Sequence, residues 1–391
     1  MTKGSIVTHD ARVATHSQIV DRRNNFDLLR QLAALQVVYF HGLSHLEINV
    51  VSTIGMFVNN LLGLFPGVPI FFVISGFLVS VAYERAPSVR SYARNRLLRV
   101  YPGLWVCFAA SLGLLVAFGA LTSSFVSTPT FCGWLISQLT VGQFYNPRAL
   151  RNFGIGVLNG SLWTIPVEIQ FYALLPFLYR FCLRSRHGWL GTPALVLLAF
   201  LSHWLWCVLQ SHAQIDTTDL RYKLLGVTLL PYLFMFILGL LIQRHLTLLA
   251  SILNGWALFW LAAYVGTCLV LKTSHVATVS LASPISLFGS AVSFSLLALF
   301  VISFALTCRS KSDQILHGND YSYGIYIYHM LVVNALVQIG WLHRPIYLAA
   351  TAVVTVGLAA GSWLLVERPA LRLKRSTIHS QATSTVCEST S

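Results

Sequence analysis

The chain has 391 residues, of which 56% are hydrophobic and only 10% are charged, and its mean hydropathy is +0.69. A soluble domain carries about 25% charged residues, so the composition excludes a soluble protein and indicates a polytopic membrane protein. The net charge of +14 does not indicate nucleic-acid binding, because the basic residues lie in short loops between apolar segments, where they determine topology.

Ten apolar stretches are close to the length of about 20 residues that a transmembrane helix needs. They cover residues 26–46, 67–83, 100–121, 163–182, 190–209, 224–243, 253–271, 281–306, 321–340 and 345–366. An eleventh stretch, 131–145, is shorter and more polar; if it crossed, Arg180, Arg184 and Arg186 would face outside, against the positive-inside rule. We therefore predict an all-α polytopic membrane protein with about ten transmembrane helices and both termini cytoplasmic, in which 131–145 lies at the surface or re-enters.

The two ends of the chain differ from the apolar region between them. Residues 1–25 are polar and lack the cleavage site of a signal peptide, so we interpret them as a cytoplasmic N-terminal tail. Residues 26–370 form the predicted transmembrane domain, and residues 371–391 form a basic, then Ser/Thr-rich cytoplasmic tail. The seven cysteines have no ligand spacing, so neither a metal site nor a disulfide framework is predicted.

The first apolar stretch contains two ionisable residues, Arg30 and His41. Such a group costs a few kcal/mol near the bilayer centre unless it has a partner or water, so a functional site is the first hypothesis. At about 3.6 residues per turn the two side chains share one helix face, about 16 Å apart along the axis, which would suit one long ligand. The alternative is an Arg that snorkels to the interface and a His that bonds to a neighbouring helix.

The loop from 84 to 99 is predicted to be cytoplasmic and is rich in arginine, including Arg94, Arg96 and Arg99. Guanidinium groups bind phosphate well, so this loop is a candidate phosphate site. The alternative is that the arginines only orient the protein. Residues 47–66 and 122–160 are predicted outside, where their few charges suggest an entrance for a neutral polar substrate such as a sugar.

Two further groups of polar residues lie in apolar stretches. Glu168 is expected about one to two turns into the bilayer from the outer side. There it should be paired or hold a proton, which suits acid–base chemistry; the alternative is a fixed ion pair with a buried Arg. In the ninth stretch, His329 lies near mid-membrane, where a hydrogen bond across helices is the favoured interpretation.

Six short motifs follow one another along the chain. They are Arg30 with His41; 69–78; 95–102; Ser161 to Trp163 with Glu168 and Tyr172; Ser322 to Gly324 with His329; and Glu367 to Pro369. Together they resemble the acyltransferase family 3 integral membrane proteins, in order and spacing, from residue 24 to about 369. The family's loop motif usually begins with two adjacent arginines, whereas here Arg94 precedes Asn95.

The resemblance implies a ten-helix O-acyltransferase of the bacterial inner membrane. It would transfer acetyl groups from cytosolic acetyl-CoA, a substrate and not a permanently bound cofactor, to hydroxyls of a surface or secreted glycan, free or lipid-linked. Exopolysaccharide, lipopolysaccharide O-antigen and lipo-oligosaccharide are the candidate acceptors.

The resemblance also implies roles for individual residues. Catalysis would fall to His41, Glu168 and Arg30, and contacts with the CoA phosphates to Arg94, Arg96 and Arg99. Candidates for substrate contact or structural support are Trp163, Tyr172, Ser322 and His329. The His41 imidazole would take a proton from the sugar hydroxyl or accept the acyl group itself, and the sequence leaves both routes open.

A proton-coupled secondary transporter is the alternative function, with intramembrane His and Glu relaying protons. Such proteins typically have inverted repeats and broken helices in matching halves, and neither is evident here. A membrane-bound O-acyltransferase of the other major class also has an intramembrane His, but no other feature matches that class.

Overall fold

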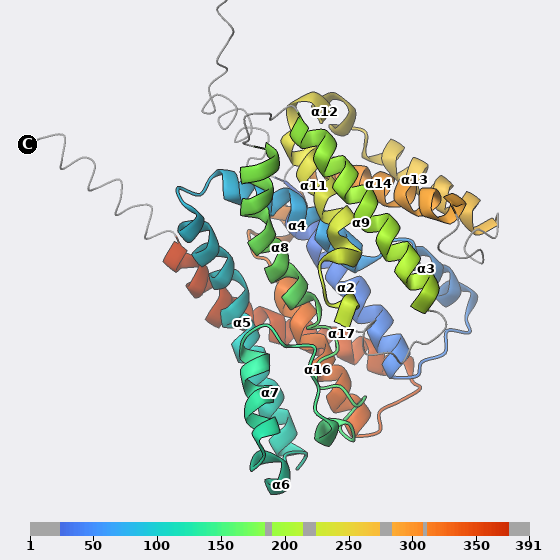
Figure 1. Ribbon diagram of the computed structural model, residues 1–391. Helices are drawn as coiled ribbons and strands as arrows, with labels where there is room; N and C mark the ends of the chain where they lie inside the picture. Colours follow the sequence, from blue (N-terminus) through green and yellow to red (C-terminus); the bar gives the residue numbers. More distant parts are fainter. Residues whose placement is uncertain (1–23, 184–189, 214–223, 274–283, 308–310, 375–391) are drawn as a thin grey trace, which may run out of the picture. The chain divides into compact units, whose positions relative to one another are not determined.

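The computed structural model describes residues 24–183, 190–213, 224–273, 284–307 and 311–374. These ranges contain helices and no strand (Figure 1). The predicted class, an all-α polytopic membrane protein, is confirmed. The residues of the two expected tails, up to 23 and from 375, lie outside the described residues.

Each of the ten predicted stretches contains a helix, although several are shorter than a full span. These helices are α2 (Phe26–His45), α4 (Gly67–Glu84), α5 (Val89–Ala117), α8 (Thr164–Leu178), α9 (Gly191–Ala213), α11 (Leu233–Arg244), α13 (Ala257–Thr273), α14 (Pro284–Leu306), α16 (Ser322–Gln338) and α17 (Pro345–Ser362). Shorter helices between them are α3 (Thr53–Gly63), α6 (Ser123–Val126), α7 (Pro129–Leu139), α12 (Leu246–Leu253) and α15 (Lys311–Leu316).

In the described part of the chain, five helices are long and apolar enough to cross a membrane, or six if α11 and α12, bent by 95°, form one broken span. The count of ten spans and the side of each terminus stay predictions. Helix α7, in the eleventh stretch, has 11 residues. Its length of about 16 Å is too short for a hydrocarbon core of about 30 Å.

The folded region begins before residue 26. Asn25 is only 1% exposed, and its backbone N–H donates to the Ala305 carbonyl at 2.9 Å. Its side-chain amide donates to the Thr307 carbonyl at 2.9 Å, and its side-chain oxygen accepts from the Ser312 N–H at 3.0 Å. Asn25 therefore belongs to the folded part, one residue earlier than the boundary that the sequence predicted.

The chain divides into two compact units, and unit 1 comprises residues 1–33, 62–87 and 173–318. Within unit 1, α4 packs on α11 through glycines. A Cβ atom on Gly76 would lie 2.0 Å from the Phe236 carbonyl oxygen, and one on Gly239 would lie 2.1 Å from that of Val73. Small residues at a helix interface let the two backbones approach closely, and here no larger residue fits.

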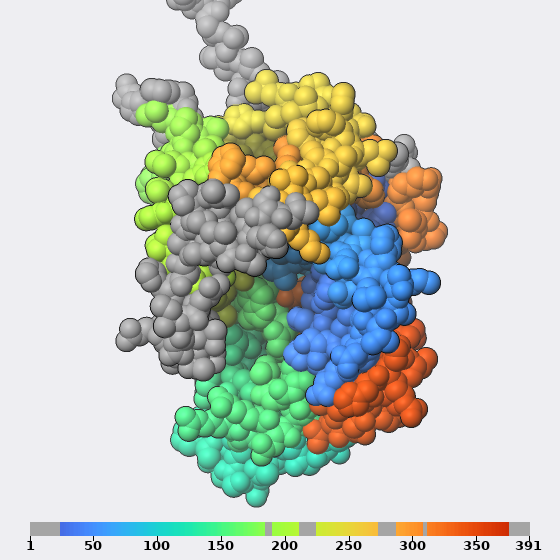
Figure 2. All heavy atoms as spheres, turned by 90° about the vertical axis from the view of Figure 1, so that its right-hand side faces the viewer, coloured from blue at the N-terminus to red at the C-terminus, as the bar shows by residue number. Residues whose placement is uncertain are grey.

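Unit 2 comprises residues 34–61, 88–172 and 319–391, and α16 lies at its centre. Every residue of α16 from Ser322 to Asn334 is buried. Helices α5 and α17 pack against it, and the Tyr323 hydroxyl donates to the Val100 carbonyl of α5 at 2.7 Å. Helix α3, by contrast, has no buried residue, and its blue spheres lie open on the face shown in Figure 2.

Residues 154–164, here called the descending segment, run along α16. The Gly154 N–H donates to Gln338 Oε1 at 2.8 Å, and Asn159 Nδ2 donates to the Ile327 carbonyl at 2.8 Å. These two positions on α16 are about 16 Å apart along the helix axis, roughly half of a hydrocarbon core. Residues 154–160, predicted outside the membrane, therefore pack along α16, and the side on which they lie stays a prediction.

Candidate active site

Two histidines meet in unit 2. His41 Nδ1 lies 2.8 Å from His329 Nε2, and the two ring centroids are 5.1 Å apart. His329 is fully buried on α16, whereas His41, near the C-terminal end of α2, is half-buried. This is the hydrogen bond across helices that the sequence predicted for His329.

The backbone of α16 determines which nitrogens carry protons. His329 Nδ1 lies 2.8 Å from the Tyr326 carbonyl oxygen. A carbonyl can only accept, so this nitrogen donates, and in a neutral ring the other nitrogen, Nε2, must then accept. The proton between the two rings therefore belongs to His41 Nδ1. As a result, His41 Nε2 keeps its lone pair, the form that a base or a nucleophile requires.

The carbonyl that orients His329 is itself held by the descending segment. Ser161 Oγ donates to the Tyr326 carbonyl at 3.1 Å, and the Tyr326 hydroxyl donates to the Ser161 carbonyl at 3.0 Å. Thr164, the first residue of α8, donates its hydroxyl to the Tyr326 hydroxyl at 3.0 Å. The Ser161 to Trp163 motif thus fixes α16 beside the histidines, with Trp163 half-buried directly before α8.

Glu168 lies on the second turn of α8 and accepts a hydrogen bond from the Tyr172 hydroxyl. The guanidinium of Arg96 lies over the Tyr172 ring, 5.8 Å from its centroid. In the described part of the chain, no hydrogen bond joins Glu168 to either histidine of the pair. The structure thus brings Glu168 together with Tyr172, and through the Tyr172 ring with an arginine, rather than with His41.

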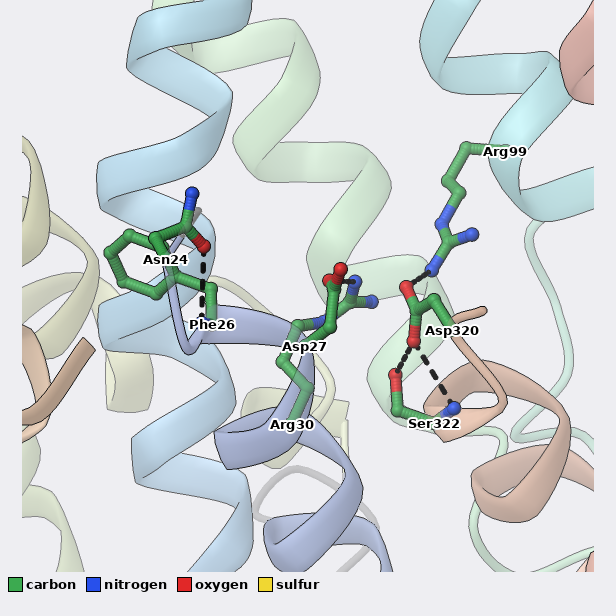
Figure 3. Close-up of polar contacts among 7 residues, drawn as sticks. All are labelled: Asn24, Phe26, Asp27, Arg30, Arg99, Asp320 and Ser322. Atoms are coloured by element: carbon green, nitrogen blue, oxygen red, sulfur yellow. Dashed lines mark hydrogen bonds and ion pairs between the residues drawn. The ribbon is translucent and has the colours of Figure 1, made fainter. Parts of the chain in front are cut away.

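Arg99 forms an ion pair with Asp320, drawn in Figure 3. The two side chains are only 15% and 10% exposed. The Asp320 carboxylate also accepts from the Ser322 N–H at 3.2 Å and from its hydroxyl, at the first residue of α16. The Arg99 guanidinium lies 5.9 Å from the ring centroids of both Tyr323 and Trp363. Arg99 and Ser322 are therefore built into the framework of unit 2.

The other arginines predicted to bind phosphate lie on a helix and not in a loop, which corrects the prediction. Helix α5 starts at Val89, where the Ser88 hydroxyl accepts from the Ser91 N–H at 3.1 Å as an N-cap. Arg94 is exposed and Arg96 is half-buried. The buried Nε of Arg96 has no hydrogen-bond partner among the described residues, so this guanidinium retains a donor for another group.

Arg30 lies on α2, and its guanidinium is 4.0 Å from the Asp27 carboxylate, one turn earlier (Figure 3). Helix α2 is continuous from Phe26 to His45. The predicted separation of Arg30 and His41, about 16 Å along one helix face, therefore applies.

Two residues of this site were not predicted from the sequence. Asp320 had a detectable signal, because an acidic residue directly before the predicted stretch 321–340 is typical of a helix N-cap. Tyr326 acts through its backbone carbonyl, and no pattern of side chains could indicate that.

Residues 23–367 match the family model described as an acyltransferase domain. The chain is 36% identical over 366 residues to Nodulation protein 10 of Rhizobium leguminosarum bv. viciae, covering 91% of this chain and 95% of that protein. It is 25% identical over 365 residues to the O-acetyl transferase of Shigella phage Sf6, covering 89% and 96%. No solved structure matches the chain.

The helices and these similarities define a multi-pass membrane O-acyltransferase. The chain belongs to acyltransferase family 3, as its six motifs predicted.

Proposed function

We propose that the protein transfers an acetyl group from cytosolic acetyl-CoA to a hydroxyl of a carbohydrate on the outer side of the bacterial inner membrane. The acceptor is a surface or secreted glycan, free or lipid-linked, of the exopolysaccharide, O-antigen or lipo-oligosaccharide type. Support comes from the family, from the relative named O-acetyl transferase, and above all from the histidine pair, which leaves His41 Nε2 with a lone pair.

In the direct route, His41 Nε2 takes the proton of the sugar hydroxyl while the oxygen of that hydroxyl attacks the thioester carbonyl carbon. The C–S bond breaks, and the CoA thiolate leaves and receives that proton from the imidazolium. His329 accepts the Nδ1–H of His41 throughout, which stabilises the positive charge on the imidazolium. Arg30, about 16 Å away along the same helix, would interact with another part of the donor.

In the second route, His41 Nε2 attacks the thioester carbon itself, and the C–S bond breaks to give an acyl-imidazolium and the CoA thiolate. The sugar oxygen then attacks the acyl carbon, the bond from that carbon to Nε2 breaks, and the neutral imidazole is restored, while the proton of the sugar hydroxyl passes to the CoA thiolate directly or through water. Both routes need the same unprotonated Nε2, so the histidine geometry supports either one.

The donor phosphates would bind at Arg94 and Arg96. Arg94 is exposed, and Arg96 has a donor without a partner among the described residues. Arg99 already pairs with Asp320, so we assign it the role of fixing α5 against α16. From Arg96 to Ala117, α5 extends about 31 Å, which matches a hydrocarbon core of about 30 Å and would place the acceptor at its far end.

The test uses the full chain in lipid nanodiscs with acetyl-CoA labelled in the acetyl group. Release of free CoA thiol, together with transfer of label to glycans purified from cells that lack the gene, is expected, and neither should occur with His41→Ala. Comparing glycans from cells with and without the gene, by mass and by O-acetyl NMR signals, identifies the acceptor. A protein that moves protons across vesicles but never cleaves the thioester would be the transporter instead.

A further inference from the structure

A pocket of about 620 Å³ lies in the part of unit 2 between α5 and the descending segment. This part comprises residues 118–151 and contains α6 and α7. The volume is within the range of about 300–1,000 Å³ that is usual for small-molecule sites. Most of its lining residues carry a hydroxyl or another polar group, and they include Tyr145, Arg148 and Arg151.

The pocket has preformed walls. Beneath it lies a buried apolar cluster that includes Trp134 and Leu150. The hydroxyls of Thr122 and Thr128, both in the lining, cap the starts of α6 and α7. Asn146 Nδ2, also from the lining, donates to the Gly156 carbonyl at 2.7 Å. The polar groups therefore stand on a packed base and need little reorganisation to bind a ligand.

The two arginines lie on the same side of one short helix. Arg148 starts a 3-10 helix, and Arg151 is its C-cap. In a 3-10 helix the side chains at positions i and i+3 eclipse one another, so the two arginines share one side of this turn, and both line the pocket. The buried Leu150 between them anchors the turn in the apolar cluster.

The charge of this arginine pair is not balanced locally. The sequence has no Asp or Glu from residue 85 to residue 167. In the described part of the chain, neither arginine takes part in an ion pair. Two like charges on one side of a polar pocket favour a ligand with anionic oxygens, which paired guanidinium donors bind well.

We propose that this pocket binds the acceptor, and that the acceptor is an anionic carbohydrate with a carboxylate or phosphate group. The anionic group would lie between Arg148 and Arg151, the lining hydroxyls would bond the sugar, and the Tyr145 ring, 42% exposed, would pack on its apolar face. This proposal rests on the proposed function. It replaces the neutral sugar that we expected from the sequence.

The test measures binding to the full chain in nanodiscs of neutral phosphatidylcholine. The probes are trigalacturonic acid and its neutral methyl ester, and glucose 6-phosphate and glucose. At least one anionic probe should bind more tightly than its neutral partner. The double variant Arg148→Gln/Arg151→Gln should weaken that binding by about tenfold or more and remove most of its salt dependence. Arg344→Gln, an exposed arginine before α17 and outside the pocket, is the control and should change nothing.

Several results would overturn the proposal. They are no binding of either anionic probe, equal binding of acid and ester, or the same loss in Arg344→Gln. If the double variant alters only the response to added phosphatidylglycerol, the arginines bind lipid headgroups and the proposal is wrong. Release of CoA thiol from acetyl-CoA, measured with glycans purified from cells that lack the gene, separates the two hypotheses: if even the unmodified chain never releases it, the proposed function fails, whatever the pocket binds.

Discussion

The two units use half-buried polar side chains in different ways. In unit 1, both carboxylate oxygens of Glu84 accept hydrogen bonds at 2.9 Å, one from the Tyr179 hydroxyl and one from Gln243 Nε2. In unit 2, the contacts of His41 leave one ring nitrogen with its lone pair, and Arg96 keeps a buried donor without a partner among the described residues. A polar group with all its bonds made holds helices together, whereas one with remaining capacity can act on a substrate.

The largest effect that this comparison predicts is at His41. His41→Ala should insert and fold normally but lose acetyl transfer, because general-base catalysis contributes about 10²- to 10⁴-fold and no other group with a free lone pair is positioned by His329. Labelled transfer by the purified variant measures this. Near-normal transfer at normal expression would show that His41 is structural, as Glu84 is in unit 1.

The next largest effect concerns stability in unit 1. Gly76→Ala should reduce the yield of folded protein and lower its melting temperature, because the new Cβ would overlap the Phe236 carbonyl oxygen. Overpacking typically costs about 1–3 kcal/mol and sometimes more. Gly266→Ala is the control, since its Cβ would meet nothing within 4 Å. If both variants melt alike, the close contact of α4 and α11 is not needed for stability.

A smaller effect separates positioning from catalysis in unit 2. His329→Leu removes the acceptor for His41 Nδ1–H, and partners that orient a functional imidazole are typically worth about 10- to 100-fold. His329→Gln offers an amide oxygen instead and should recover part of the loss in kcat, while KM for acetyl-CoA stays unchanged in both. Equal kcat in the Leu and Gln variants would mean that His329 only fills space.

The smallest effect is expected at the arginines. Arg96→Gln should raise KM for acetyl-CoA by about tenfold, in a salt-sensitive way, with kcat near normal, because it removes a charge-assisted contact to phosphate. Arg99→Gln alone would leave Asp320 buried and unpaired, so the matched comparison is the double variant Arg99→Gln/Asp320→Asn. It should raise KM for acetyl-CoA less than Arg96→Gln does. Unchanged donor dependence in Arg96→Gln at normal insertion would reduce the arginines to orientation signals.

The sequence predicted the helices well because an apolar stretch of bilayer length can satisfy its backbone hydrogen bonds in few structures other than a helix. It also indicated His41 and Arg30 as candidate site residues, since an ionisable group in such a stretch needs an explanation, and their roles stay predictions. It did not predict the descending segment, because residues 154–161 resemble any neutral loop. The missed signal lay on α16, where Asn334 and Gln338 are polar and bind this segment.

The partners of the site residues could not be predicted from the sequence. Glu168 was expected one to two turns into the bilayer with a role in catalysis, and the partner that the structure gives its carboxylate is the Tyr172 hydroxyl. Arg99 was assigned to phosphate, and its ion pair depends on Asp320, which is 221 positions away in the chain. Spacing along one helix is local information, whereas the choice of partner is set by how helices far apart in sequence pack.

The glycine contacts of unit 1 also limit motion. Gly76 of α4 faces the backbone of α11, and Gly239 of α11 faces the backbone of α4. Because each contact fits a backbone carbonyl against a Cα, α4 and α11 cannot slide or rotate past one another without first separating, and shear between packed helices needs that freedom. This pair is therefore expected to move as one rigid body, and under the proposed function the movement that admits the donor and releases CoA would occur at other helices.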